Sequence, residues 1–313
     1  MIIDAHAHVY PEVRGRTKGG ETRSVGYGKM SVGGIPGGRV LPPHAIETKF
    51  TPEMLIEYMD WGGVDRTMLL QGPFYGECNR YASEAIKRYP DRFFGSAFLD
   101  PWSPGWRSQF EEAVEELGFR AVKLELSEAT GLVGLHPDLC LDDPEVAWLW
   151  VELERQDFTL TLDLGAVGAP SYQTRAVRGI IERHPDLRIV IAHLCQPNPS
   201  VEQDAGRLAL WKEQVSLAQT PNVWMDTAAL PAYLDAEGYP YPSARHYLRM
   251  AVDLVGPDKI MWGTDVPGLL TVATYKQLVA AGWAHSDFLS HEDQAKIMGG
   301  NALRVYGAQY GAL

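Results

Sequence analysis

The feature that most constrains the fold is an alternation of short apolar segments and longer amphipathic ones, repeated eight times along the 313 residues. Several short segments are apolar on both faces, which is typical of parallel strands covered by helices. The expected strands are residues 2–9, 66–70, 93–99, 120–126, 159–164, 188–193, 223–226 and 259–263. The expected helices are residues 52–61, 79–89, 106–117, 144–156, 172–184, 201–218, 243–255 and 272–281.

Eight strand–helix pairs in succession predict an α/β protein, a single (β/α)8 TIM barrel over residues 1–313. An extra carboxyl-terminal helix is expected over residues 290–305. The alternative, an open doubly wound sheet, is less favoured because no G-x-G-x-x-G follows the first strand. Residues 14–43 interrupt the alternation with many glycines and few large apolar side chains. We interpret them as a mobile lid loop inserted after the first strand; the alternative is a solvated insertion without a catalytic role.

The composition excludes some classes of partner. Lys and Arg total 28 against 40 Asp and Glu, a formal charge of -12, and no basic run suggests nucleic-acid binding. The three cysteines, Cys78, Cys140 and Cys195, are odd in number and far apart, which favours a reducing compartment. The amino terminus lacks the pattern of a signal peptide, and no apolar run is long enough to span a membrane. We therefore expect a soluble, cytoplasmic protein whose partner is a small molecule.

Two histidines of the first strand are candidate metal ligands. His6 and His8 lie two residues apart, so a strand projects both imidazoles to the same face. Two imidazoles aimed together into the mouth of a barrel make a suitable pair of ligands for a divalent metal. The alternative is that each is an ordinary buried histidine with a hydrogen-bond partner.

His193 ends the sixth expected strand, and Asp265 follows the end of the eighth. Ionisable residues at the carboxyl ends of TIM-barrel strands tend to be catalytic, because the active site lies at that rim. His193 has the alternative of a structural bond to a backbone carbonyl, and Asp265 that of capping the following segment. The convergence of four such residues on one rim favours an active site.

The chain resembles the amidohydrolase-related family that includes enzymes of the aminocarboxymuconate semialdehyde decarboxylase type. The matching motifs, in order, are DAHAH, GFRAVKL, RIVIAH, WGTDVP and GGNALRVY, and they are spread over nearly the whole chain. The resemblance implies a TIM barrel with one divalent ion, zinc first, held by His6, His8 and Asp265. It also implies that His193 lies near the substrate, as a further ligand or as an electrophile.

Two positions of the fourth and fifth strands complicate the resemblance. The family usually has a histidine at the end of strand five, and this chain has Asp163 there. As a fourth ligand, Asp163 would make the site more anionic and bring manganese or magnesium into consideration beside zinc. Lys123 corresponds to a lysine that is carboxylated and bridges two metals in binuclear relatives but generally not in the decarboxylase-like branch; the alternatives are an ion pair with a rim carboxylate and a contact with the substrate.

Other side chains near the expected rim are candidates for substrate binding. Trp102 follows the third strand and is suited to stacking on a planar ring. Tyr75 and Arg80 follow the second strand. Arginines of the insertion, at positions 16, 23 and 39, are suited to clamping a carboxylate.

The leading functional hypothesis is metal-assisted hydrolysis of a small carboxylated substrate, a cyclic ester, lactone or amide, with Asp265 as the acid–base group and His193 polarising the carbonyl. Non-oxidative decarboxylation of a small unsaturated or aromatic acid is the alternative for the same residues, and hydration of a double bond is a third. Asp163 in the histidine position also leaves open a catalytically inactive binding barrel. A homodimer is common for such barrels and is allowed here.

Overall fold

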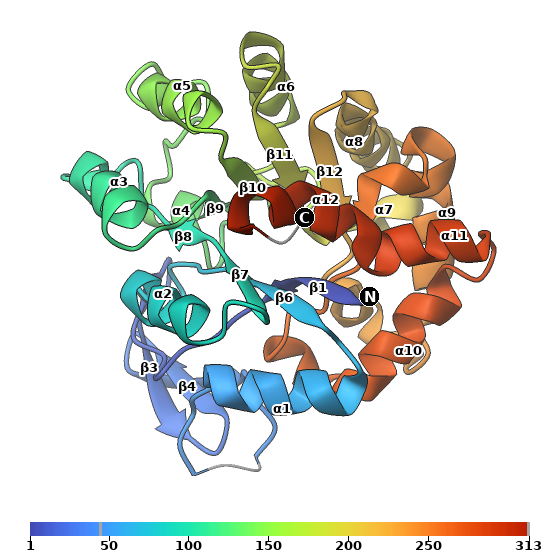
Figure 1. The fold of residues 1–313 in the computed structure, drawn as a ribbon, viewed down its shortest axis with the longest axis horizontal. Helices are drawn as coiled ribbons and strands as arrows, with labels where there is room; N and C mark the ends of the chain where they lie inside the picture. Colours follow the sequence, from blue (N-terminus) through green and yellow to red (C-terminus); the bar gives the residue numbers. More distant parts are fainter. Residues whose placement is uncertain (44–45, 312–313) are drawn as a thin grey trace.

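The computed structural model describes residues 1–43 and 46–311 and consists of a barrel of parallel strands surrounded by helices (Figure 1). The prediction of a TIM barrel is confirmed, and each expected strand is present. The barrel strands are β1 (Ile3–Ala7), β6 (Arg66–Leu69), β7 (Phe93–Gly95), β8 (Ala97–Phe98), β9 (Ala121–Glu125), β10 (Thr159–Asp163), β11 (Arg188–Ile191), β12 (Val223–Asp226) and β13 (Ile260–Met261).

The strands form two hydrogen-bonded runs, β1-β6-β7 and β13-β12-β11-β10-β9-β8, that together complete the ring. β7 and β8 are two halves of one expected strand, interrupted at Ser96. The first and last strands are joined by backbone bonds from Ala5 N to Trp262 O (3.0 Å) and from Asp265 N to His6 O (2.7 Å). This closure places the segment after β13 directly beside the histidines of β1.

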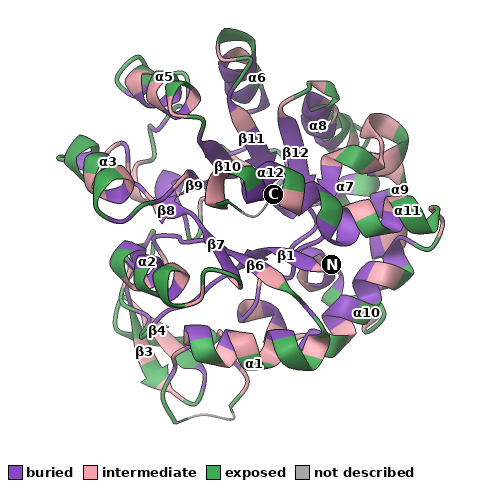
Figure 2. Cartoon of the chain, in the orientation of Figure 1, coloured by how far each residue is buried: buried purple, intermediate pink, exposed green. Residues whose placement is uncertain are grey.

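Helices cover the outside of the barrel and bury its strands, as Figure 2 shows. They are α1 (Pro52–Gly62), α2 (Asn79–Arg88), α3 (Trp106–Glu115), α4 (Leu132–Leu135), α5 (Ala147–Arg155), α6 (Thr174–Arg183), α7 (Pro199–Glu202), α8 (Ala205–Ser216), α9 (Pro242–Val255), α10 (Tyr275–His285), α11 (His291–Ala295) and α12 (Asn301–Tyr306). Capping residues determine where several of these helices begin and end. The hydroxyl of Thr51 caps the amino end of α1, and Gly63 (φ 72°) ends that helix in the left-handed conformation.

The extra carboxyl-terminal helix is present in two parts, because a π-helical turn over Lys296–Gly300 separates α11 from α12. α12 lies across the amino-terminal end of the barrel (Figure 1). Its Ala302, Val305 and Tyr306 pack with Ile3, Phe94 and other residues of the barrel interior. The interior is therefore closed at this end, and chemistry is confined to the opposite, carboxyl-terminal end of the strands.

The insertion after β1 is not the irregular loop that its composition suggests. It forms an antiparallel sheet of β2 (Arg16–Thr17), β3 (Gly20–Gly26), β4 (Lys29–Val32) and β5 (Ile35–Arg39). The insertion forms strands rather than an irregular loop because its glycines build turns, and its role as a lid stays a prediction. Gly33 and Gly34 both have positive φ and form a two-residue hairpin loop between the paired residues Val32 and Ile35. The sheet is anchored on the loop after β6, where Arg14 N donates to Tyr75 O at 3.0 Å.

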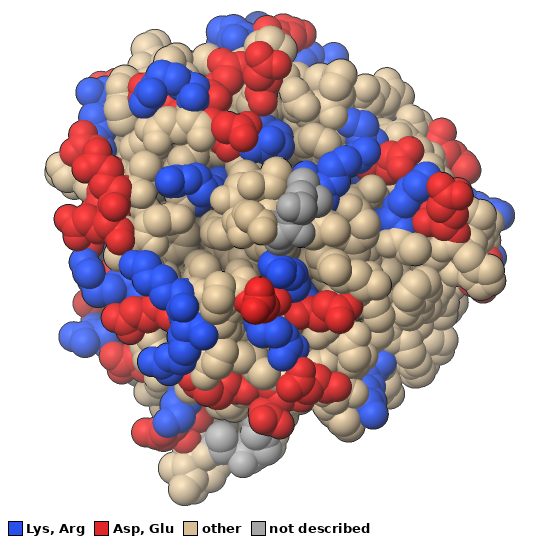
Figure 3. All heavy atoms as spheres, viewed as in Figure 1, with Lys and Arg blue, Asp and Glu red and all other residues tan. Residues whose placement is uncertain are grey.

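Both acidic and basic side chains are spread over the face that carries α12, in small groups of either sign (Figure 3). Within residues 1–43 and 46–311, none of the helices has the length and apolar character needed to cross a membrane.

Candidate active site

A cavity of about 690 Å³ opens at the carboxyl-terminal ends of the barrel strands. His8, Lys123, Asp163, His193 and Asp265, from five different strands or the segments that follow them, line this cavity. The inserted sheet and its flanking segment contribute Lys18 and Val40 to the wall. The cavity therefore collects ionisable residues that are far apart in the sequence.

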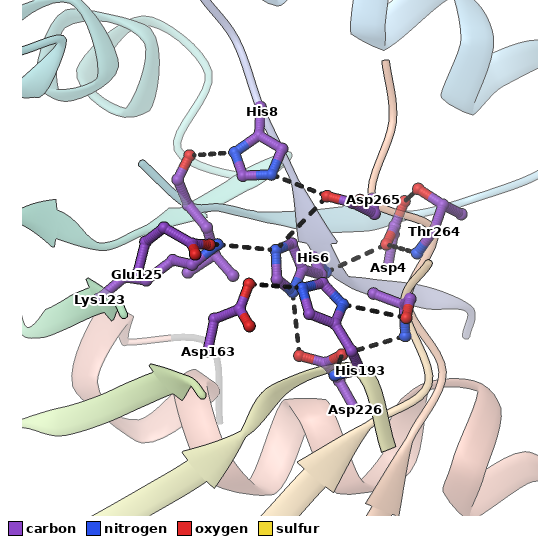
Figure 4. Close-up of polar contacts among 12 residues, drawn as sticks. Asp4, His6, His8, Lys123, Glu125, Asp163, His193, Asp226, Thr264 and Asp265 are labelled. Atoms are coloured by element: carbon purple, nitrogen blue, oxygen red, sulfur yellow. Dashed lines mark hydrogen bonds and ion pairs between the residues drawn. The ribbon is translucent and has the colours of Figure 1, made fainter. Parts of the chain in front are cut away.

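His6 of β1, His8 directly after that strand and Asp265 after β13 converge at the floor of the cavity (Figure 4). Oδ1 of Asp265 lies 2.9 Å from Nε2 of His8 and 3.7 Å from Nε2 of His6. Asp265 itself has a positive φ of 64°, a strained conformation for a residue other than glycine. One donor atom from each of the three residues lies within 4.8 Å of the other two, which is close enough to bind one ion.

The other ring nitrogen of each histidine already has an acceptor. Nδ1 of His8 lies 2.9 Å from the carbonyl oxygen of Leu70, and Nδ1 of His6 lies 3.0 Å from Oδ2 of Asp226. Because a carbonyl oxygen and a carboxylate only accept, both Nδ1 atoms carry the proton. In the neutral imidazoles, the lone pairs are therefore on the two Nε2 atoms that face Asp265.

The electrostatics of His6, His8 and Asp265 keep their lone pairs available to a metal ion. Burial lowers the pKa of both imidazoles, that of His6 well below its ordinary value, and the charge of Lys123 acts in the same direction. Burial alone would raise the pKa of Asp265, but its contacts with His8, His6 and His193 outweigh burial and lower that pKa. Two neutral imidazoles and one ionised carboxylate result.

Asp4 supports this group from below. Asp4 begins the part of β1, up to Ala7, in which the pairing with β6 is irregular. The carboxylate of Asp4 accepts bonds from the hydroxyls of Thr264 (2.6 Å) and Tyr275 (3.1 Å). It thereby ties the segment that carries Asp265 to the strand that carries the histidines.

His193 belongs to a second histidine–carboxylate group. Its Nε2 lies 2.9 Å from Oδ2 of Asp163, and its Nδ1 lies 3.0 Å from the carbonyl oxygen of Ala228. Burial would lower the pKa of His193, but the charge of Asp163 and the bond to it raise that pKa to about 10. With its pKa raised in this way, the imidazole is protonated at neutral pH.

Asp163 is held by hydrogen bonds to residues outside the group formed by His6, His8 and Asp265. Besides His193, it accepts bonds from the backbone N–H of Gly165 (3.1 Å) and from Nε2 of Gln196 (3.3 Å). The structure does not bring Asp163 into the group formed by His6, His8 and Asp265. The interpretation of Asp163 as a fourth ligand to the same ion therefore receives no support from its position.

Lys123 and Glu125 project from β9 into the cavity. Nζ of Lys123 is 3.2 Å from Nε2 of His6 and 3.8 Å from Oε2 of Glu125. Burial raises the pKa of Glu125 to about 8, and the neighbouring charge of Asp163 contributes to this increase. Lys123 thus lies between the first group and a carboxyl group that is largely protonated at neutral pH.

The candidates for substrate binding divide into two sets. Tyr75 and Lys123 line the cavity, and the ring of Tyr75 lies 4.9 Å from that of His8. Arg80 is an exposed residue of α2 that pairs with Glu112 of α3, on the outer helical layer. Trp102 packs against the hydrophobic core and is not part of the cavity lining. The structure therefore does not bring Arg80 or Trp102 to the site.

Three residues of the site were not singled out from the sequence. Asp226 accepts a bond from the backbone N–H of His193 (2.9 Å) besides its contact with His6, and it forms a second group of possible ligands with these two histidines. Its position as the last residue of β12 was a usable signal, the same one that indicated Asp265. Gln196 and Tyr233 also line the cavity, but both lie in irregular or short helical segments without a comparable signal.

The fold and the site together define a TIM-barrel enzyme with a histidine–aspartate centre at the mouth of the barrel. The sequence profile of the amidohydrolase family matches residues 3–308. The chain belongs to this family, and the family resemblance inferred from its motifs is confirmed.

Relatives with assigned activities include both hydrolases and decarboxylases. An L-fucono-1,5-lactonase from Burkholderia ambifaria is 26% identical over 84% of this chain and 87% of its own length. A gamma-resorcylate decarboxylase from Rhodococcus jostii is 26% identical over 72% of this chain and 73% of its own. Among solved structures, an amidohydrolase from Burkholderia multivorans with bound HEPES superposes with a TM-score of 0.72 at 20% identity, covering 98% of this chain and 99% of that one. The prediction of an enzyme of the hydrolase or carboxy-lyase kind agrees with these relatives.

Proposed function

We propose that the protein is a metal-assisted hydrolase of a small cyclic ester, a lactone. The observation that carries this proposal is the convergence of Nε2 of His6, Nε2 of His8 and Oδ1 of Asp265 at the floor of the cavity. The likeness to a lactonase that aligns over most of both chains supports the choice of a lactone as the substrate.

The donor set fits a divalent metal ion. With its proton on Nδ1, neutral His8 directs a lone pair at the carboxylate of Asp265 from 2.9 Å, a repulsive contact that a shared cation would relieve. A ligating histidine commonly donates its other ring N–H to a carbonyl or a carboxylate, as His8 does to Leu70 and His6 to Asp226. Two imidazoles and one carboxylate suit zinc, with manganese or magnesium as alternatives. When bound, such an ion lowers the pKa of water toward about 7 and polarises a carbonyl oxygen.

Asp265 is the proton carrier of the proposed reaction. Its side chain is 24% exposed, toward the cavity, whereas that of His6 is fully buried. Because its pKa is lowered, the carboxylate is ionised and accepts the proton of the attacking water. It then passes this proton to the ring oxygen that leaves as the ester bond breaks.

Positive charge in the cavity wall stabilises the oxyanion that forms during the attack. His193 is protonated beside Asp163, and Lys123 is buried at the inner end of the cavity. In a partly water-excluded site, fixed charges of this kind lower the energy of an anionic transition state more than they would in water. The phenol of Tyr75, whose pKa burial raises well above the ordinary value, stays protonated and is a donor to the substrate.

The test is hydrolysis of a panel of five- and six-membered lactones in water enriched in ¹⁸O. We expect the protein with one bound zinc or manganese ion to incorporate one solvent oxygen into the product carboxylate. Chelation should remove the activity and lower the melting temperature, since a ligand that binds only the folded state stabilises it. Absence of metal binding and of lactone hydrolysis would together overturn the proposal.

Decarboxylation of a small aromatic acid is the second candidate, favoured by the alignment with gamma-resorcylate decarboxylase over 72% of this chain. The same residues would serve it, with Asp265 supplying a proton to the carbon that loses carbon dioxide. Release of carbon dioxide from hydroxybenzoates, without incorporation of solvent oxygen, distinguishes this reaction from hydrolysis. A cytoplasmic location and a homodimer remain predictions from the sequence.

A further inference from the structure

The turn that follows β11 is a run of four left-handed residues. His193, Leu194, Cys195 and Gln196 have φ angles of 62°, 48°, 59° and 56°. Residues other than glycine normally adopt this conformation singly, because the Cβ atom crowds the following carbonyl oxygen. Strained backbone persists only where the surrounding structure holds it, and it is concentrated at functional sites.

The surrounding structure holds this turn from several sides. Nε1 of Trp211 donates to the carbonyl oxygen of Leu194 at 2.9 Å. The hydroxyl of Tyr172 donates to the carbonyl oxygen of Cys195 at 3.3 Å. The side chains of Leu194 and Cys195 are buried in the main hydrophobic core. The unfavourable backbone is therefore a rigid part of the cavity wall.

The left-handed run brings the side chains of its first and last residues to one carboxylate. Nε2 of His193 is 2.9 Å from Oδ2 of Asp163, and Nε2 of Gln196 is 3.3 Å from Oδ1 of the same residue. Gln196 is only partly buried and lines the cavity. Asp163 thus orients both His193 and Gln196 toward the space that a substrate would occupy.

The proposed reaction gives Gln196 no task, yet its amide has unused hydrogen-bonding capacity. One N–H is directed at Asp163, which leaves the second N–H and the carbonyl oxygen with its two lone pairs. A donor and an acceptor on one planar group complement a hydroxyl, which both donates and accepts. Ser127, Thr130, Tyr233 and Glu125 add further groups of this kind to the lining.

We propose that Gln196 binds a ring hydroxyl of the substrate, and that the lactones this enzyme hydrolyses are hydroxylated ones of the sugar-lactone class. This inference rests on the proposed function and makes it more specific. A plain lactone has the same ester bond but nothing for Gln196 to bind, so Gln196 raises the preference for the hydroxylated ring over the plain one.

The test compares hexono-1,5-lactones with δ-valerolactone in wild type, Gln196→Leu and Gln196→Gly. We expect KM for the hydroxylated lactones to rise about tenfold in both variants, the factor expected for one lost hydrogen bond, with little change for δ-valerolactone. Glycine relieves the strain at a positive φ, so Gln196→Gly should fold with an unchanged or higher melting temperature even if Gln196→Leu does not. Gln203→Leu, at an exposed position outside the cavity lining, is the matched control and should change neither KM.

Inhibition and binding measurements separate this inference from the proposed function. 1,5-Anhydrohexitols carry the ring hydroxyls but no ester bond, so we expect them to bind wild type more tightly than Gln196→Gly by about the same factor of ten. If wild type hydrolyses lactones but the variants lose activity equally on plain and hydroxylated rings, the inference fails and the proposed function stands. If wild type hydrolyses none of them, the proposed function fails, and equal binding of the anhydrohexitol by both proteins would overturn the inference as well.

Discussion

The two histidine–aspartate groups of the cavity are built from the same residue types but present different atoms. In the first group, His6 and His8 each have Nδ1 bonded to an acceptor, which leaves two Nε2 lone pairs facing Asp265. In the second group, the pKa of His193 is raised by the charges of Asp163, Asp265 and Asp226, so the ring is a cation paired with Asp163. The first group is suited to binding a metal ion, and the second to placing charge and orienting a neighbouring side chain.

This difference teaches that the protonation of a buried histidine is set by the balance of charges around it, because His8 and His193 both have a carbonyl oxygen at Nδ1 and a carboxylate at Nε2. Burial and the charge of Lys123 lower the pKa of His8, although Asp265 opposes them. The charges of Asp163, Asp265 and Asp226 outweigh burial and raise the pKa of His193. Four experiments test the comparison, ordered by the size of the expected effect.

Asp265→Asn should have the largest effect. The amide cannot accept the proton of water, so we expect turnover of the lactone substrate to fall about 10²- to 10⁴-fold, the usual contribution of a positioned acid–base group. The measurement is kcat on metal-loaded protein, with circular dichroism to establish that the fold is retained. Unchanged turnover would remove Asp265 from the mechanism.

Asp226→Asn should weaken metal binding, because Asp226 orients His6 by accepting from its Nδ1. A carboxylate in this position typically contributes about 10- to 100-fold in metal affinity. Asp163→Asn is the matched control in the second group, and its zinc affinity, measured by competition with a chelator, should stay within a few-fold of wild type. If the control weakens zinc as much as Asp226→Asn does, Asp163 is a ligand after all and the two groups are not distinct.

The second group should also make stability depend on pH in the metal-free protein. The folded-state pKa of His193, about 10, is above its ordinary value of 6.5, so its stabilising contribution is complete below pH 6.5 and is lost as pH rises toward 10. We expect the melting temperature of chelator-treated wild type to fall between pH 8 and pH 10, a range above the pKa of Glu125. Asp163→Asn, which cannot stabilise the imidazolium, should show a flatter profile. Parallel profiles would contradict a charged His193.

Arg80→Ala should have the smallest effect, because Arg80 lies outside the candidate active site. Arg80 forms an exposed ion pair with Glu112, and such pairs are worth about 0–1 kcal/mol. We expect KM, kcat and the melting temperature to stay close to wild type. A marked rise in KM would mean that the substrate extends from the cavity to the outer helices.

Much of the fold could be predicted because its signals are local. The apolar segments and the capping residues, such as Thr51 and Gly63 at the ends of α1, lie within the elements they define. The insertion differs from the expected loop because glycine suits irregular structure and tight turns alike, and here Gly33 and Gly34 supply the positive φ angles of a tight hairpin. The same residue type permits both outcomes, and only pairing with a neighbouring strand distinguishes them.

The sequence by itself determined which residues end which strands, and hence that His6, His8, His193 and Asp265 meet at one rim. The tertiary structure decided which atom faces which partner. His6 depends on Asp226, 220 residues away, and His8 on the carbonyl oxygen of Leu70, 62 residues away. Asp163, expected beside the metal, instead pairs with His193. Hydrogen-bond partners set the protonation and orientation of a buried imidazole, and partners so distant in the chain are brought together only when the barrel closes.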